Sequence, residues 1–332
     1  MRYIMPIVEQ LDRAARELVT DHPINNRLAL ILVDNATELV LHMCCTTHVR
    51  FAKEYLKLGE EKLSPSQRRM ALGPYLDGKL RVLHDLGEIT EDERRFVTIC
   101  HDYRNELYHV GLKHEKVIRA VAGKYYELAC NLFGRLQPAF VIWSSTDQFT
   151  EVGRRYLAKA NDGKIFPLEV GKLAPVLLAE RPEVHALPTA LVRAADDSID
   201  NLEKSFEFIV NDNPAELESD DLLKKIQFHY DFLARVEKDG IEGSNWDPAY
   251  RQRISDLHNE MRKSWRSRHK RIPLDNWRRR AKAVGVETDE LRALAIYQAL
   301  RNDMLYLEDA VGEAAAGLDA WIQGETDRAR GK

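Results

Sequence analysis

Apolar residues recur at the three- and four-residue spacing of an α-helix along most of the chain. This spacing predicts helices over residues 6–20, 26–58, 116–136, 189–209 and 220–238. The breaks between them fall at Gly, Pro, Asn or Asp residues, which favour turns. Strand-like alternation is nearly absent, and a small hairpin is predicted only at residues 155–170. We therefore predict an all-α fold.

The helix predicted over residues 26–58 carries an apolar face and a line of polar residues. Asp34, Glu38 and His42 follow one another at four-residue spacing, so they share one side of the helix. The apolar face is predicted to consist of Leu28, Leu32, Ala36, Leu39, Met43 and Thr47. The polar line has two interpretations. It turns toward the helix of residues 98–110, where Glu38 would orient a histidine or an arginine, or it is an ordinary solvated face.

The helix that ends near residue 110 contains the sequence Arg104-Asn105-Glu106-Leu107-Tyr108-His109. Its apolar stripe is predicted to consist of Phe96, Cys100, Tyr103, Leu107 and Val110. His101, Asn105 and His109 lie almost opposite this stripe, so we expect them to face water or another subunit. Arg104 lies between the two faces, and its long side chain can reach the polar one.

Two helix starts carry recognisable caps. Ser64-Pro65-Ser66-Gln67 places a serine cap before a proline in the first turn. Thr90 and Glu93 form the pattern of a capping box at the start of the Arg104 helix. The boundaries of that helix are therefore well specified.

The character of the chain changes between about residues 144 and 188. Turn-forming residues recur there at Asn161, Gly163, Pro167, Pro175, Pro182 and Pro188. We predict a helical domain at residues 1–143, a connector at 144–188 and a second helical domain at 189–332.

The second domain contains a basic segment at residues 251–282. It holds twelve Lys and Arg residues against three Asp and Glu residues. Cationic side chains neutralise phosphates and aromatic faces stack on unpaired bases, so the mixture suits RNA. A solvated surface with core tryptophans is the alternative interpretation. The predicted RNA-binding residues are Arg262, Lys263, Trp265, Arg266, Arg268, Arg271, Trp277 and Arg278.

Two stretches of the chain are similar in spacing. Residues 74–105 run from a proline through a glycine and a threonine to Arg-Asn, and residues 273–302 follow the same order. In this comparison Tyr306 takes the place of His109. The similarity predicts a degenerate internal repeat, and a chance likeness of two amphipathic helices is the alternative.

Composition and charge narrow the class of protein. The 332 residues are 44% hydrophobic and 31% charged, which excludes a disordered or fibrous chain. A formal charge of −4 argues against unselective coating of nucleic acid. We find no apolar run near the roughly 18 residues of a membrane span, and we expect a cytoplasmic protein without membrane contact. The four cysteines form no C-x-x-C pair and are expected to be reduced and buried.

The residues of the motif helix suit phosphodiester chemistry. Asn105 and His109 are neighbours at four-residue spacing, so the amide can orient the imidazole. A histidine can accept a proton from a ribose 2′-hydroxyl or give one to a leaving 5′-oxygen. Arg104 can hold the scissile phosphate. Because in-line cleavage needs an acid and a base, a second histidine is required, either His101 or His109 of a facing subunit.

The sequence Arg104-Asn105-Glu106-Leu107-Tyr108-His109 in an all-helical domain resembles the Arg-x4–6-His motif of HEPN domains. The resemblance covers about residues 1–140. It implies a helical bundle that dimerises, a composite ribonuclease site without metal or other cofactor, and cleavage that leaves a 2′,3′-cyclic phosphate. Many members of that family are toxins or defence effectors with a cognate antitoxin. Gly111 stands where one toxin subgroup has tyrosine, so the antitoxin modification known for that subgroup does not transfer.

We therefore predict an endoribonuclease that acts on an RNA substrate as a homodimer or as a pseudo-dimer within one chain. Arg104 would clamp phosphate, Asn105 would orient, and His109 would act as general acid or base. The supporting residues are predicted to be His101, Tyr108, Asp34 and Glu38. No metal site is predicted.

Three alternatives remain beside this interpretation. Asn105 and His109 can form a surface pair while Arg104 makes a helix salt bridge with Glu106 or Glu115. A metal phosphohydrolase of HD type would use His84-Asp85 and His101-Asp102, with His42 or His48 completing the ligands. A non-catalytic module would bind RNA, a nucleotide or a protein through the same helix.

Overall fold

A computed structural model describes residues 3–50, 63–109, 115–137, 149–164, 169–213, 217–244 and 246–330 of the chain. Within these ranges it contains thirteen α-helices, one short 3-10 turn and no strand, so the predicted all-α fold is confirmed. The elements are α1 (Ile4–Thr20), α2 (Pro23–Arg50), α3 (Pro65–Leu72), α4 (Leu76–Asp85), α5 (Glu91–His109), α6 (Glu115–Arg135), α7 (Glu151–Ala160), η1 (Val170–Lys172), α8 (Leu173–Ala179), α9 (Leu187–Asp212), α10 (Ser219–Lys238), α11 (Pro248–Ser264), α12 (Leu274–Val286) and α13 (Glu290–Ala329).

The chain divides into two compact units that differ from the predicted domains. The first unit comprises residues 1–192 and 284–296, and the second comprises residues 193–283 and 297–332. The first unit therefore includes the whole predicted connector and a short segment from late in the sequence. Each unit is described separately below.

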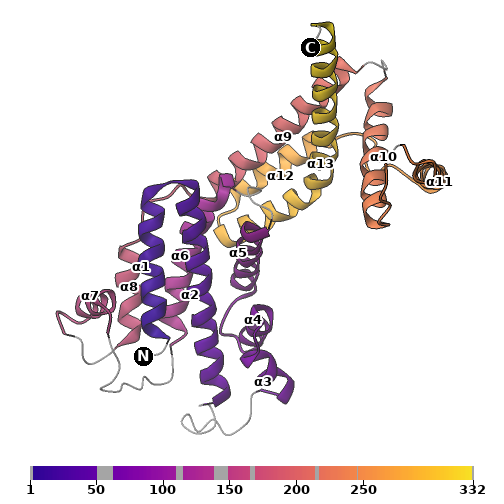
Figure 1. Cartoon of the computed structure of the whole chain (residues 1–332). Coiled ribbons are helices and arrows are strands. Elements are labelled where there is room, and N and C mark those ends of the chain that lie inside the picture. The colour runs from indigo at the N-terminus through magenta and orange to yellow at the C-terminus, as the bar shows by residue number, and fades with distance from the viewer. Residues whose placement is uncertain are drawn as a thin grey trace. The chain divides into compact units, whose positions relative to one another are not determined.

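Helix α2 is the central element of the first unit. It packs against α1, α3, α4, α5 and α6, and Figure 1 shows it running beside α1. Because neighbours cover several of its sides, its buried residues do not form one stripe. The predicted apolar face is wrong at Leu28, which is 36% exposed, whereas Ala29, Val33 and Val40 are fully buried.

The composition of α2 differs from the expectation that no apolar run approaches the length of a membrane span. Within this helix an 18-residue window has a mean hydropathy of 1.6 and few charges, so by length and composition the helix is apolar enough to cross a membrane. In the structure, 61% of that window is buried inside the chain. The core helix of a bundle meets the same criterion.

The predicted connector is helical and packed. Helix α7 covers residues 151–160, where the hairpin was expected to begin, and α7 and α8 both pack on α1. Pro175 and Pro188 lie in the first turns of α8 and α9. A proline is tolerated there because the first backbone N–H groups of a helix lack partners within it. These prolines therefore mark helix starts, which the sequence pattern had suggested were breaks in a linker. Pro167 lies outside the described residues.

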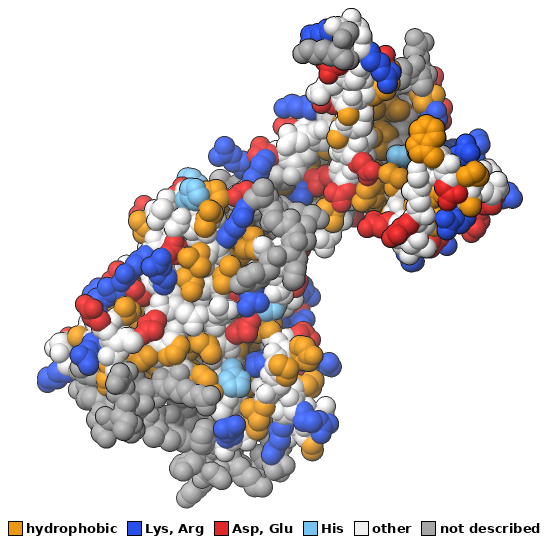
Figure 2. Space-filling model, viewed as in Figure 1, with side chains coloured by type: hydrophobic (Ala, Val, Ile, Leu, Met, Phe, Trp, Pro, Cys, Tyr) orange, Lys and Arg blue, Asp and Glu red, His pale blue; other side chains and the backbone are white. Residues whose placement is uncertain are grey.

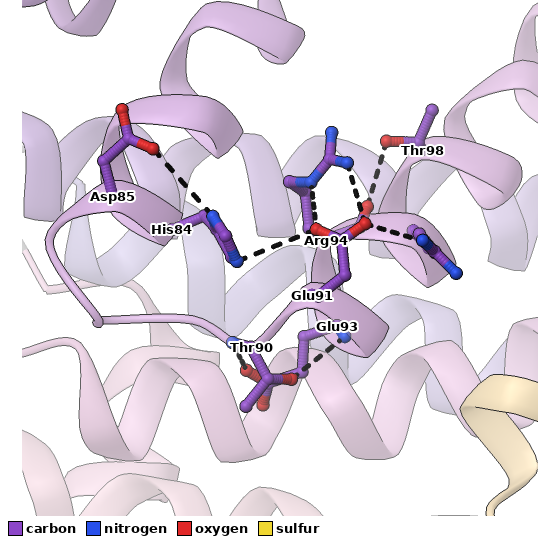
Figure 3. A network of polar contacts seen from close by, with 8 residues as sticks. His84, Asp85, Thr90, Glu91, Glu93, Arg94 and Thr98 are labelled. Carbon is purple, nitrogen blue, oxygen red and sulfur yellow. Dashed lines mark hydrogen bonds and ion pairs between the residues drawn. The ribbon is translucent and has the colours of Figure 1, made fainter.

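Both predicted caps are present. At α3 the Ser64 side chain accepts from the Gln67 backbone N–H, and the Gln67 side chain accepts from the Ser64 backbone N–H. At α5 the Thr90 N–H donates to Glu93 Oε2 at 2.8 Å, and the Glu93 N–H donates to Thr90 Oγ1 at 3.2 Å (Figure 3). These reciprocal bonds fix the residue at which each helix begins.

The first turn of α5 is also held by a charged network. Glu91 receives bonds from Arg94 and Arg95 at 2.7 Å and lies 3.7 Å from His84 of α4 (Figure 3). Its bond with Arg94 lowers the pKa of the Glu91 carboxyl to about 2. Beyond this turn the predicted stripe is confirmed for Phe96, Cys100 and Tyr103, which are buried, whereas Val110 lies outside the described residues.

We expect Thr90→Ala to lower the free energy of unfolding by about 1 kcal/mol, because it removes the side chain that accepts the Glu93 N–H. For a unit of this size the melting temperature should fall by about 2–4 °C. The matched control is Thr98→Ala on the same helix, whose hydroxyl only donates to the Arg94 carbonyl one turn earlier. Calorimetric melting that shows equal losses for both variants would contradict the capping role.

Candidate functional site

A buried carboxylate joins three helices of the first unit. Asp34 of α2 is fully buried. Its Oδ1 accepts a hydrogen bond of 3.0 Å from the Tyr125 hydroxyl of α6, and its Oδ2 lies 2.9 Å from His101 Nδ1 of α5. A charge buried in this way costs several kcal/mol unless it is paired. Asp34 is therefore the anchor of a polar cluster inside an apolar bundle.

Arg104 completes the cluster from the next turn of α5. Its Nε lies 3.5 Å from Asp34 Oδ2. Its guanidinium donates at 3.0 Å to the side-chain oxygen of Asn105 and at 3.0 Å to that of Asn35. Asn35 was not predicted, although its position next to Asp34 placed it beside the polar line. The arginine is thus fixed by both α2 and its own helix.

Glu38 is the second carboxylate of the cluster. One turn after Asp34 on α2, it lies 3.4 Å from His101 Nδ1. The predicted polar face is therefore confirmed for Asp34 and Glu38, which turn toward the Arg104 helix. His42 is different, since its ring meets the Tyr3 ring edge to face with centroids 5.5 Å apart.

The cluster shifts the titration of its members. The hydrogen bond with Asp34 raises the pKa of His101, and the charges of Asp34 and Glu38 act in the same direction. Burial and the nearby Asp34 charge raise the pKa of Glu38. His101 is therefore biased toward the imidazolium form beside a carboxylate.

An open cleft of about 690 Å³ adjoins the cluster. Helix α2 lines it with residues spaced on one face, including Asn35 and Glu38, which also contact the α5 side chains. Lys79 lies at the opposite wall, where it donates to the Gly73 carbonyl. The full lining consists of Gln10, Asn35, Glu38, Leu39, His42, Leu72, Gly73, Pro74 and Lys79. Solvent and small polar molecules can therefore reach the edge of the cluster.

One predicted orientation on α5 is corrected. His101 was expected to face water or another subunit, but it contacts Asp34 and Glu38 of α2. The reason is that α5 has a neighbouring helix outside its apolar stripe as well. Asn105 accepts a hydrogen bond from Arg104 of its own helix. His109 is the last residue of α5, and the side chains of Tyr108 and His109 lie outside the described residues.

The ligand set of an HD-type metal site is not assembled among the described residues. His84 lies 3.9 Å from Asp85 and 3.7 Å from Glu91, within its own surface network. His101 instead belongs to a group with Asp34 and Glu38. The two His-Asp pairs therefore do not converge on one point.

Part of the basic segment of the second unit is paired with carboxylates or buried. Trp277 is 1% exposed and is part of the core, so its predicted role in base stacking is wrong. Trp265 donates to Asp231 at 2.8 Å, and Arg268 covers the Tyr306 ring at 4.0 Å from its centre while it also pairs with Asp231. Arg278 pairs with Asp200 and Glu203.

The remaining predicted RNA-binding residues are exposed. Arg271 lies 3.8 Å from Asp220. Figure 2 shows Lys and Arg side chains interspersed with Asp and Glu on the visible face. The exposed predicted residues are Arg262, Lys263, Arg266, Arg268 and Arg271.

The two stretches of the predicted repeat have the same order of elements. Both contain a helix, a short turn and a second helix, namely α4–α5 and α12–α13. Helix α13 is capped by Asp289, which accepts from the Leu291 N–H at 2.9 Å. Arg301 pairs with Glu308 of its own helix, unlike Arg104. The internal repeat stays a prediction.

Comparison of the chain with known protein families, with curated proteins and with solved structures found no match. The function is therefore inferred from the geometry of the cluster. That geometry consists of a buried carboxylate, an imidazole with a raised pKa, and an arginine, beside an open cleft.

We expect Tyr125→Phe to lower the free energy of unfolding by about 1.5–3 kcal/mol, because it removes a hydrogen bond to a buried charged acceptor. The control is Tyr126→Phe on the same helix. Its hydroxyl donates at 2.8 Å to the neutral Leu177 carbonyl, so the loss should be only about 0.5–1.5 kcal/mol. Urea unfolding of both variants measures the difference. A larger loss at Tyr126 would show that Asp34 does not depend on Tyr125.

We expect the Asp34–His101 pair to make stability depend on pH. Because folding raises the pKa of His101, its contribution is complete below the unfolded value of about 6.5 and is lost as the pH rises through the folded pKa. Urea unfolding at a series of pH values should show this decline in the wild type and a flatter profile in His101→Gln. His84→Gln, which leaves the pair intact, should keep the wild-type slope. An unchanged slope in His101→Gln would contradict the assignment.

Proposed function

We propose that the protein is a metal-independent endoribonuclease of HEPN type. The observation that carries the proposal is the Asp34–His101 pair beside Arg104, because it adds an oriented histidine to the helix that bears the Arg104–His109 motif. A motif with one histidine supplies only one of the two proton transfers that the reaction needs. His101 supplies the other.

The reaction is attack of a ribose 2′-oxygen on the adjacent phosphorus. The bond from the 2′-oxygen to phosphorus forms, the bond from phosphorus to the 5′-oxygen breaks, and a 2′,3′-cyclic phosphate remains. His109 takes the proton of the 2′-hydroxyl. His101, whose raised pKa favours imidazolium, gives a proton to the leaving 5′-oxygen. No step consumes a cofactor.

Arg104 stabilises the negative charge that accumulates on the phosphate oxygens. It lies between the two histidines on α5, about 4.5 Å along the axis from His101 and about 7.5 Å from His109 at the usual rise of 1.5 Å per residue. Asn35 and Asn105 hold its guanidinium in place. Asn105 thus orients the arginine, and the cleft beside Glu38 admits the substrate.

The proposed partners follow from this chemistry. RNA is the substrate, and the exposed Arg262, Lys263 and Arg266 contact its phosphates. A second copy of the chain brings two motif helices together. As a cytoplasmic toxin or defence effector, the protein would be controlled by a cognate antitoxin.

One observation favours a non-catalytic alternative. Arg104 is already engaged by Asp34, Asn35 and Asn105, which is also how an arginine with a purely structural role is held. In that case the helix would bind RNA or a protein without cleaving anything.

The test is incubation of single-stranded RNA with purified protein in a chelator, followed by analysis of the RNA ends. We expect the wild type to leave 2′,3′-cyclic phosphate. His109→Ala and His101→Gln should each lose about 10²–10⁴-fold in rate, because each removes one proton transfer. Arg104→Ala should lose activity as well. His84→Ala, a half-exposed histidine outside the cluster, should cleave like the wild type.

Circular dichroism of each variant separates loss of activity from loss of fold. Full cleavage by both His109→Ala and Arg104→Ala would show that the proposed site is wrong. RNA binding without cleavage by any of the proteins, the wild type included, would establish the non-catalytic module.

A further inference from the structure

A second group of side chains able to bind a metal lies near the C-terminal end of α2. Cys44 and His48 are one turn apart in the last part of the helix, and Glu88 lies in the turn between α4 and α5. Their ligand atoms all lie within 4.8 Å of one another. His48 Nε2 is 3.0 Å from Glu88 Oε1. The three groups therefore converge from two separate parts of the first unit.

We propose that Cys44, His48 and Glu88 bind a divalent zinc ion. Thiolate, imidazole and carboxylate are the three side-chain ligands that zinc takes in proteins, with bonds of about 2.0–2.3 Å. Three protein ligands leave the fourth tetrahedral position to a water molecule. From the sequence, Cys44 was expected to be only a buried apolar residue. The sequence pattern that indicates a zinc site here is Cys-x-x-x-His, because this spacing places both ligands on one face of a helix.

The charges around the three residues suit a cation. Zinc binds the thiolate form of cysteine, so binding at Cys44 would release the thiol proton. The thiolate and Glu88 then balance the two charges of the ion. Arg135 donates to the Glu88 backbone carbonyl and to the Glu93 carboxylate, which compensates its charge.

The backbone that carries Glu88 is already held in place. Its N–H donates to the Leu83 carbonyl at 2.9 Å, and the Gly87 N–H donates to the His84 carbonyl at 2.9 Å. Gly87 has φ +76°, a conformation that glycine adopts without strain. A metal ion therefore needs little rearrangement of this turn. Bound there, it would link the end of α2 to the segment that leads into α5.

The other group of candidate ligands, Asp34, Glu38 and His101, suits a metal less well. The positive charge of Arg104 lies 3.5 Å from Asp34, and the Tyr125 hydroxyl already donates to that carboxylate. A cation would have to displace both. The group also lacks a thiol, the ligand most selective for zinc over magnesium and calcium.

The experiment is titration of the full chain, freed of metal, with cobalt as a spectroscopic probe and with zinc in competition against a chelating indicator. We expect one equivalent of metal per chain and a thiolate-to-cobalt charge-transfer band. Cys44→Ala and Glu88→Gln should each weaken zinc binding by more than about 100-fold, since even outer-shell groups contribute about 10–100-fold. Because Glu88 is half-exposed, we expect Glu88→Gln to fold, so it tests the site even if the buried change Cys44→Ala prevents folding.

Two matched controls locate the ion. Cys130→Ala removes another buried thiol, and Glu38→Gln alters the competing group, and both should bind zinc like the wild type. The proposal is overturned if the wild type binds no stoichiometric zinc, or if Glu88→Gln binds it undiminished. If cobalt binds without a thiolate band, and if this binding is lost in Glu38→Gln, the metal lies at the group of Asp34, Glu38 and His101, and the proposal is overturned as well. None of these results depends on RNA cleavage.

Discussion

The first unit is organised around one buried carboxylate. An unpaired carboxylate at Asp34 would strongly destabilise an apolar core. Its partners come from two other helices, Tyr125 from α6 and His101 and Arg104 from α5. Each partner fixes the rotation of its helix about its axis, because a slip of one residue would remove it from the carboxylate. The apolar surfaces supply the bulk of the packing free energy, and Asp34 determines which arrangement of the three helices is satisfied.

The same interaction couples stability to the proposed chemistry. The imidazole and guanidinium that would act on a phosphodiester are also the groups that neutralise the buried charge. Removing either one leaves Asp34 short of a partner, so a loss of activity is expected to come with a loss of stability. Conservative variants that keep a hydrogen bond are therefore more informative than alanine. The adjoining cleft shows where solvent meets this otherwise buried arrangement.

The fold was predictable where local chemistry decides it. Capping residues such as Ser64 and Thr90 fix helix starts through bonds to their own neighbours, and the α5 stripe follows from a single buried side. Prediction failed where tertiary partners decide. Helix α2 is covered on several sides, so no one stripe describes it, and Trp277 is buried although it lies in the basic segment. For the cluster, spacing correctly grouped Asp34 with Glu38 and aimed them at α5. Spacing did not predict the contact of Asn35 with Arg104 or that of Glu88 with Cys44, because both contacts depend on how segments distant in sequence meet.

The apolar composition of α2 also has a consequence during synthesis. Its partners α1, α3 and α4 surround only part of it, and α6 is complete only when the ribosome has reached Arg135. At about 5–20 residues per second, α2 waits for a time on the order of ten seconds with part of its apolar surface uncovered. In that interval a nascent chain presents the same apolar helix that a membrane insertion pathway or a chaperone recognises. Production of α6 is therefore a condition for covering α2 and for folding of the first unit.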